Sequence, residues 1–125
     1  MPVPDHAARF QEGGAEGRLL LQRCVSCAHV PGLPRIACPR CFGPLGWFEA
    51  PGTGRIVSCA ILRRTHNEQF ERHLPIVLAL VRLDAGAELI STLVGPDRLE
   101  AAIGRPVDVA REDRWSTLVQ FRLAD

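Results

Sequence analysis

The second half of the chain places its hydrophobic residues with the spacing of β-strands. Val57, Cys59 and Ile61 alternate with other residues along 55–65, which predicts a strand with one apolar face. The segment 75–84 is almost continuously apolar, which is typical of a central strand covered on both faces. Three further strands are predicted at 88–94, 105–112 and 115–123, the last with strict alternation at Trp115, Thr117, Val119, Phe121 and Leu123.

The connections between these strands indicate the type of barrel. Ala85 and Gly86 form a turn signal typical of hairpins, and the polar segment 66–74 has no periodicity and is expected to be a loop. The segment 97–103 predicts a helix of about two turns that ends at Gly104. A short helix between the third and fourth of five strands is typical of an OB fold, a five-stranded and partly open barrel.

The first half of the chain has weaker signals. Residues 5–16 predict a short helix that docks through Phe10, and 17–23 predicts a strand that leads into the first cysteine. Prolines break helices and central strands, and three of them fall in 24–41, so this stretch is expected to consist of turns and short ribbons. A short strand is predicted at 47–50.

The cysteines indicate a metal centre. Four of the five form two Cys-x2-Cys pairs, Cys24 with Cys27 and Cys38 with Cys41, as in zinc ribbons. Four thiolates complete a tetrahedral zinc shell and leave no position for water or substrate, so we predict one structural zinc per chain. A pair of redox dithiols or an iron site are the alternatives. The fifth, Cys59, is expected to be a small buried thiol on its strand face.

These elements divide the chain into three parts, with mainly β structure overall. The turn cluster at 51–54 gives the boundary, so we predict an N-terminal helix in 1–17, a zinc ribbon in 18–50 and an OB-fold domain in 51–125. The length of 125 residues is that of one domain or of two very small modules.

Composition and charge exclude several classes of protein. A net charge of +1 argues against a strongly basic nucleic-acid-binding protein. No apolar run approaches the roughly 20 residues of a membrane-spanning helix, and the first residues do not resemble a signal peptide, so a cytoplasmic protein without a membrane partner is expected. Reduced thiols rather than disulfides are expected in that compartment.

No arrangement of catalytic residues is recognisable in the sequence. His66, Glu68, Glu71 and His73 share the polar 66–74 segment, where a solvated mobile loop is a simpler interpretation than a second metal site or an acid–base pair. Phe70 in that segment is either an anchor for a partner or a lid over the barrel. His29, two residues after Cys27, is expected to be a neighbour of the metal site rather than a ligand.

An ordered series of positions runs from about residue 10 to 123: Phe10, Glu16 to Leu19, Gln22 to Cys24 with Cys27, Pro34 and Arg35, Cys38, Pro39 and Cys41, Trp47, Gly52, Gly54, Ile56 and Ser58, 75–84 with Gly86, and Ile103, Gly104, Pro106 and Val107. This series resembles the domain-of-unknown-function-35 family, which combines a short helix, a rubredoxin-like zinc ribbon and an OB fold. Two positions depart from the family pattern, because Ala28 stands where glycine is common and Gln11 where tryptophan is common.

The resemblance implies a non-catalytic accessory subunit. Such proteins bind a thiolase-like enzyme (a thiolase, aldolase or ketosynthase type) and help to hold its acyl-CoA, so we expect a heterotetramer with two copies of each chain. Acyl-CoA is expected near the junction of ribbon and barrel. Arg35 and Arg40 are candidate ligands for its phosphates, and Arg63 and Arg64 are weaker ones.

Three alternatives stay open at this point. The first is a partner of a hot-dog-fold enoyl-CoA hydratase, and the second is a module that binds single-stranded nucleic acid, because both zinc ribbons and OB barrels do so. The third is an enzyme that acts alone.

Overall fold

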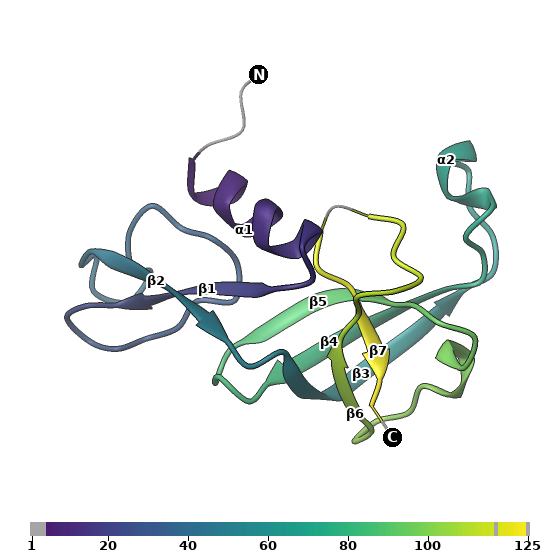
Figure 1. Ribbon diagram of the computed structural model, residues 1–125. Coiled ribbons are helices and arrows are strands. Elements are labelled where there is room, and N and C mark those ends of the chain that lie inside the picture. The colour runs from purple at the N-terminus through teal and green to yellow at the C-terminus, as the bar shows by residue number, and fades with distance from the viewer. Residues whose placement is uncertain (1–4, 117, 125) are drawn as a thin grey trace.

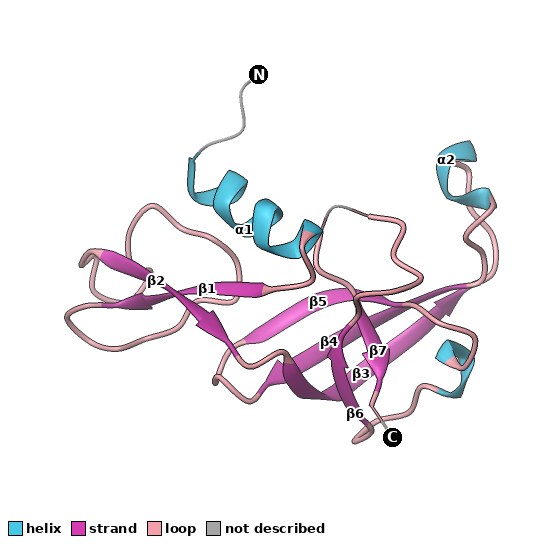
Figure 2. Ribbon diagram, in the orientation of Figure 1, coloured by secondary structure: helices cyan, strands magenta, loops and turns pink. Residues whose placement is uncertain are grey.

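A helix, a two-stranded ribbon and a five-stranded barrel follow one another along the chain in the computed structural model, which describes residues 5–116 and 118–124 (Figures 1 and 2). The helix α1 spans Asp5–Ala15, and the ribbon consists of β1 (Leu19–Cys24) and β2 (Leu45–Ala50). These two strands are antiparallel, with Leu19 opposite Ala50 and Cys24 opposite Leu45.

The barrel is closed in the strand order β3-β4-β5-β7-β6. Its elements in chain order are β3 (Thr53–Leu62), the one-turn helix α2 (Glu68–Glu71), β4 (Ile76–Leu83), β5 (Glu88–Leu93), the 3₁₀ turn η1 (Arg98–Glu100), β6 (Pro106–Val109) and β7 (Phe121–Leu123). Neighbouring strands are antiparallel except β5 and β7, which are parallel and pair only at Leu93 and Phe121. The predicted mainly β class with a zinc ribbon and an OB barrel is therefore confirmed.

One apolar core connects the three parts. Val77, Val81 and Phe121 of the barrel are fully buried, and the inner face of β1 joins them through Leu19 and Leu21. Phe10 of α1 is also buried in this core, as expected. Burial of each such side chain contributes about 1.5–3 kcal/mol to the free energy of folding, so the core is the main source of stability for the barrel.

Close backbone approaches hold α1 and the ribbon against their neighbours. Gly13 is buried inside α1, where an added Cβ would lie 2.7 Å from Cγ of Leu20, so glycine lets the helix approach β1. An added Cβ at Gly32 would overlap the backbone carbonyl of Glu88 at the start of β5. These glycines therefore fix where the helix lies on the ribbon and where the ribbon contacts the barrel.

A half-buried arginine connects the C-terminal part of the chain to α1. The guanidinium of Arg114 donates hydrogen bonds to the backbone carbonyls of Gly14 and Ala15, the latter at 2.6 Å. These carbonyls belong to the last turn of α1, where a positive charge is stabilised by the helix dipole. The loop that carries Arg114 is thereby held against the helix.

Several predicted boundaries were wrong in detail. The strand predicted over 115–123 is reduced to β7. The side-chain Oε1 of Gln120 accepts hydrogen bonds from the backbone N–H groups of Trp115 and Ser116, so these groups do not pair with a neighbouring strand. Thr117, placed on that strand, lies outside the described residues. The helix predicted at 97–103 is only the 3₁₀ turn η1, whereas the predicted loop 66–74 contains α2.

The expectation of a buried Cys59 was also wrong. A β-bulge between Ile56 and Ser58 shifts the register of β3 on β4, and every residue from Ser58 to Leu62 is exposed. Over this half of the strand, β4 is the only partner of β3 within the described ranges, since β6 pairs with β3 only at 53–55. The strand therefore extends past the barrel, and its alternation does not mark a buried face.

Candidate functional site

The two Cys-x2-Cys pairs adopt the same backbone turn. In the first, the N–H of Ala28 donates to the carbonyl of Cys24, and the N–H of Cys24 donates to the carbonyl of His29. In the second, Phe42 donates to Cys38 and Cys38 to Gly43 in the same pattern. Each knuckle thus presents two thiol groups from one rigid turn.

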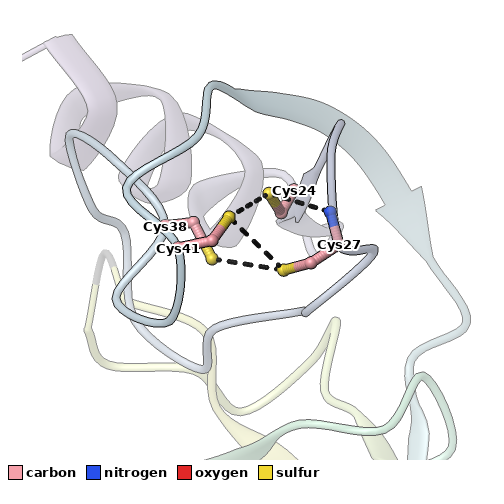
Figure 3. A group of neighbouring side chains, drawn as sticks. All are labelled: Cys24, Cys27, Cys38 and Cys41. Carbon is pink, nitrogen blue, oxygen red and sulfur yellow. Dashed lines mark hydrogen bonds between the residues drawn. The ribbon is translucent and has the colours of Figure 1, made fainter.

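The two knuckles bring four sulfur atoms together (Figure 3). The Sγ atoms of Cys24 and Cys41 are 3.4 Å apart, and the Sγ of Cys27 lies 3.6 Å from Cys38 and 3.7 Å from Cys41. Thiolates that bind zinc tetrahedrally at about 2.3 Å lie about 3.8 Å from one another. The four cysteines are therefore positioned to bind one metal ion, and the donor set fits zinc.

Hydrogen bonds at the site set the acidity of two thiols. The backbone N–H of Cys27 donates to Sγ of Cys24 at 3.4 Å and lowers the pKa of Cys24 to about 6. At Cys41, a backbone hydrogen bond from Gly43 lowers the pKa, but the bonds with Cys24 and Cys27 and burial raise it more, to about 12. The knuckle backbone thus favours a thiolate at Cys24 even before a metal binds.

The residue after each cysteine pair has an unusual backbone. Ala28 has φ of 64° and Phe42 has φ of 62°, a left-handed conformation that costs a residue with a Cβ about 1–2 kcal/mol. The turn itself requires this conformation, which explains why glycine is common at the position of Ala28 in the family that the sequence resembles.

A buried glutamine closes the loop between the knuckles, and sequence reasoning did not assign it this role. Gln22 of β1 is 5% exposed, and its side-chain amide pairs with the backbone of Arg35. Its Nε2 donates to the carbonyl at 3.0 Å and its Oε1 accepts from the N–H at 2.7 Å. In the sequence, Gln22 was noted only as one position of the family resemblance. Its place as a polar residue in a mostly apolar strand was the feature that could have indicated a buried hydrogen-bonding role.

An apolar groove with a volume of about 560 Å³ lies where α1, the ribbon and the barrel meet. Its walls come from all three parts and include Phe10, Leu33, Phe70, Leu89, Ile90 and Leu118. The groove coincides with the junction at which the sequence predicted that acyl-CoA would lie. It is the most apolar depression on the part of the molecule that the structure describes.

Side-chain contacts fix one wall of this groove. The ring of Trp115 stacks on His73 with centroids 4.3 Å apart and contacts Phe70 at 5.9 Å. Gln120 holds the Trp115 backbone and donates to Oγ1 of Thr92 at 2.7 Å. Phe70 therefore lies against Trp115 and the groove, which favours the lid interpretation over a free anchor.

The four predicted phosphate-binding arginines are not brought together. Arg35 and Arg40 are exposed on the loop that connects β1 to β2, and Arg35 follows a residue of the groove wall, Pro34. Arg63 and Arg64 are exposed after β3, on the segment leading to α2 at the opposite end of the molecule (Figure 1). Of the four, only Arg35 directly follows a groove residue. Arg40 lies further along the same loop, and Arg63 and Arg64 lie on the segment that leads to α2.

The other candidate residues form no second metal cluster within residues 5–116 and 118–124. His66, Glu68 and Glu71 are exposed around α2, and His73 is engaged with Trp115. His29 contributes its backbone carbonyl to the first knuckle, as a neighbour of the site. None of the described helices has the length and apolar character needed to cross a membrane.

Fold and site together define a rubredoxin-like zinc ribbon joined to an OB barrel. Family models agree, since the zinc ribbon domain of ChsH2 matches residues 11–45 and the C-terminal OB-fold domain of ChsH2 matches residues 47–111. The chain belongs to the domain-of-unknown-function-35 family, in the group that these ChsH2 domains describe. The family resemblance seen in the sequence is confirmed.

Two curated relatives support this assignment. A probable enoyl-CoA hydratase alpha subunit from Thermomonospora curvata is 39% identical over 126 residues, covering 96% of this chain but only 38% of that protein. A DUF35 domain-containing scaffold protein from Methanothermobacter thermautotrophicus is 34% identical over 89 residues, which cover 70% of this chain and 66% of the relative. The chain therefore spans less than two thirds of either relative.

Solved structures show the same architecture. The Ltp2–ChsH2(DUF35) aldolase contains a chain with 31% identity and a TM-score of 0.79, and the match covers 100% of this chain and 99% of that one. A DUF35-family protein of unknown function from Sulfolobus solfataricus matches with 14% identity and a TM-score of 0.66, covering 98% and 87% of the two chains. The second likeness concerns the fold alone.

Proposed function

We propose that this chain is a non-catalytic accessory subunit that binds a thiolase-like enzyme in the cytoplasm and helps to hold its acyl-CoA. The observation that carries the proposal is the full-length likeness to the ChsH2(DUF35) chain of an aldolase whose other named component is Ltp2. The metal site agrees with a supporting role, because four cysteines leave a tetrahedral zinc without a position for substrate. The symmetric form of such a complex has two copies of each chain.

The apolar groove is where this chain would hold acyl-CoA. Its walls offer the acyl portion an apolar surface, and Arg35 stands next to groove residue Pro34, with Arg40 further along the same loop. A guanidinium donates two parallel hydrogen bonds to phosphate oxygens, so an arginine beside an apolar groove suits a ligand with a phosphorylated head and an apolar tail. Arg63 and Arg64 are less suitable because neither they nor the residues next to them in sequence line the groove.

The test compares wild-type chain with the double variant Arg35→Ala, Arg40→Ala in complex with the thiolase-like subunit from the same host. With both subunits at concentrations that saturate the complex, we expect the KM for acyl-CoA to rise by about tenfold in the variant. An unchanged KM would remove the phosphate assignment. Wild-type chain that does not associate with any thiolase-superfamily subunit of its host would refute the proposed function.

Catalytic inactivity of the isolated chain needs its own measurement. Thiolysis, retro-aldol cleavage and hydration of acyl-CoA by the pure chain are expected to equal the blank, because no nucleophile, acid and base are arranged around the groove among its described lining residues. Turnover by chain that is free of partner would contradict this expectation.

A hydratase partner is the second candidate. It is favoured by one observation, the relative named as a probable enoyl-CoA hydratase alpha subunit, of which this chain matches 38%. Incubation of this chain with the thiolase-like and the hydratase subunits in competition would decide between them, since the proposal expects the thiolase-like complex to form preferentially.

A further inference from the structure

The loops around the metal site expose large apolar side chains. Val25 of the first knuckle is 73% exposed, Phe42 after the second knuckle is 83% exposed, and Ile36 between them is 87% exposed. These three residues, which we refer to as the ribbon tip, are anchored to the metal-binding loops at the end of the molecule opposite α2 (Figure 1). Side chains of this size and exposure contribute nothing to the core of this chain.

Phe42 combines a left-handed backbone with an exposed aromatic ring. Its φ of 62° lies in the left-handed region, where a bulky side chain is unusual, and the ring is almost fully exposed. Glycine would form the same turn without strain and without an exposed ring. A strained backbone that holds an aromatic side chain in solvent is typical of a position maintained for contact with another molecule.

The charge of the ribbon indicates what kind of molecule this is. Residues 17–48 contain four arginines and no aspartate or glutamate. Arg18 is paired with Glu16 and Glu49, whereas Arg35 and Arg40 have no ion pair with a described carboxylate. The ribbon tip thus exposes apolar side chains on a loop that also carries these two arginines, a combination that is complementary to an apolar pocket with an acidic rim.

A protein fits this surface better than a nucleic acid does. Val25 and Ile36 are aliphatic and provide no flat face on which a base could stack, and only Phe42 at the tip is aromatic.

We propose that the ribbon tip docks into an acidic-rimmed apolar pocket on the thiolase-like subunit, with Phe42 as the central anchor. The inference rests on the proposed function, because it names the surface through which that partner is bound. It is separate from the acyl-CoA groove, which is lined by Leu33 and Pro34 rather than by the three residues of the tip.

The two equivalent knuckle positions provide a matched test. Phe42→Gly removes both the ring and the backbone strain, so the variant is expected to hold its metal and to unfold at a higher urea concentration than wild type. The same variant is expected to bind the thiolase-like subunit at least about tenfold more weakly. Ala28→Gly relieves the same strain at the other knuckle without removing a large side chain, and is expected to show the gain in stability with unchanged binding.

The outcomes separate the inference from the proposed function. If wild type binds the subunit and Phe42→Gly binds as tightly, the docking surface is wrong and the proposed function stands. If wild type does not bind it, both fail. Binding of a single-stranded oligonucleotide that is lost in Phe42→Gly, or a wild-type dimer in sedimentation that this substitution dissociates, would overturn the proposal in favour of those occupants.

Discussion

The ribbon and the barrel are stabilised in different ways. The barrel has five strands around fully buried residues such as Val81, Val107 and Phe121. The ribbon has two strands, of which β1 buries one face and β2 is mostly half-buried, and its long loop is held by Gln22 and by four converging cysteines. A region that depends on metal ligands rather than on a core can expose apolar side chains without loss of stability.

The largest effect is expected from removal of the metal. Zinc binding in small peptide ribbons contributes about 10–16 kcal/mol, so a strong chelator should unfold the ribbon of this chain. Hydrogen exchange is expected to show loss of protection over 19–50 while amides of β4 and β5 stay protected. Metal analysis should give about one zinc per untreated chain. A ribbon that stays folded and protected from exchange in metal-free protein would contradict the view that the ribbon depends on its metal for stability.

Truncation of a side chain in the barrel core should destabilise the barrel and leave metal binding by the ribbon unchanged. Phe121→Ala removes a fully buried ring and is expected to lower the free energy of unfolding of the barrel by about 3–5 kcal/mol. Zinc content measured in the folded variant should stay that of wild type. Ile90→Ala, at a residue that is 72% exposed, is the control and should change stability by less than about 0.5 kcal/mol.

A methyl group at the junction tests whether the two regions depend on each other. Gly32→Ala would place Cβ against the Glu88 carbonyl, so the loop must move away from β5, at a cost of about 1–3 kcal/mol. Amide shifts are expected at the start of β5 as well as in the loop. Gly46→Ala is the matched control in the ribbon, since its nearest neighbour, the Arg23 carbonyl, would be 4.0 Å from the new Cβ. Equal stability and equal amide shifts in the two variants would show that the ribbon loop does not pack closely against β5.

The smallest effect concerns the amide that closes the ribbon loop. Gln22→Glu keeps the acceptor for the Arg35 N–H but removes the donor to its carbonyl, and should destabilise the ribbon by about 1 kcal/mol at neutral pH. Release of zinc to a chromogenic chelator should be faster than in wild type. An unchanged release rate would mean that the metal alone orders the loop.

The metal centre and the order of the elements were predictable because their signals are local. The spacing of Cys24, Cys27, Cys38 and Cys41 fixes two turns and a donor set irrespective of what surrounds them. The apolar run at 75–84 likewise becomes the strand β4 between β3 and β5, because a short run rich in Val, Ile and Leu favours a covered strand.

The errors arose where a side chain or a bulge replaced a regular pattern. The alternation of apolar residues from Trp115 onward predicted a strand. Instead, the side chain of Gln120 accepts a hydrogen bond from the Trp115 N–H, and the ring of Trp115 packs on His73. The bulge near Val57 changes which residues of β3 face inward, and alternation alone does not show it. The lining of the groove could not be predicted from the sequence for a different reason. Its residues are distant in sequence, and only tertiary packing brings them together.

The hydrogen bonds of Arg114 have a consequence for synthesis of the chain on the ribosome. They join residues about 100 positions apart, so the last turn of α1 stays without this partner until Arg114 has been translated. All four cysteines and β2 leave the exit tunnel well before Arg114 does, and β7, which closes the barrel, follows Arg114. We therefore expect a nascent chain to acquire its metal before α1 is secured and the barrel is closed.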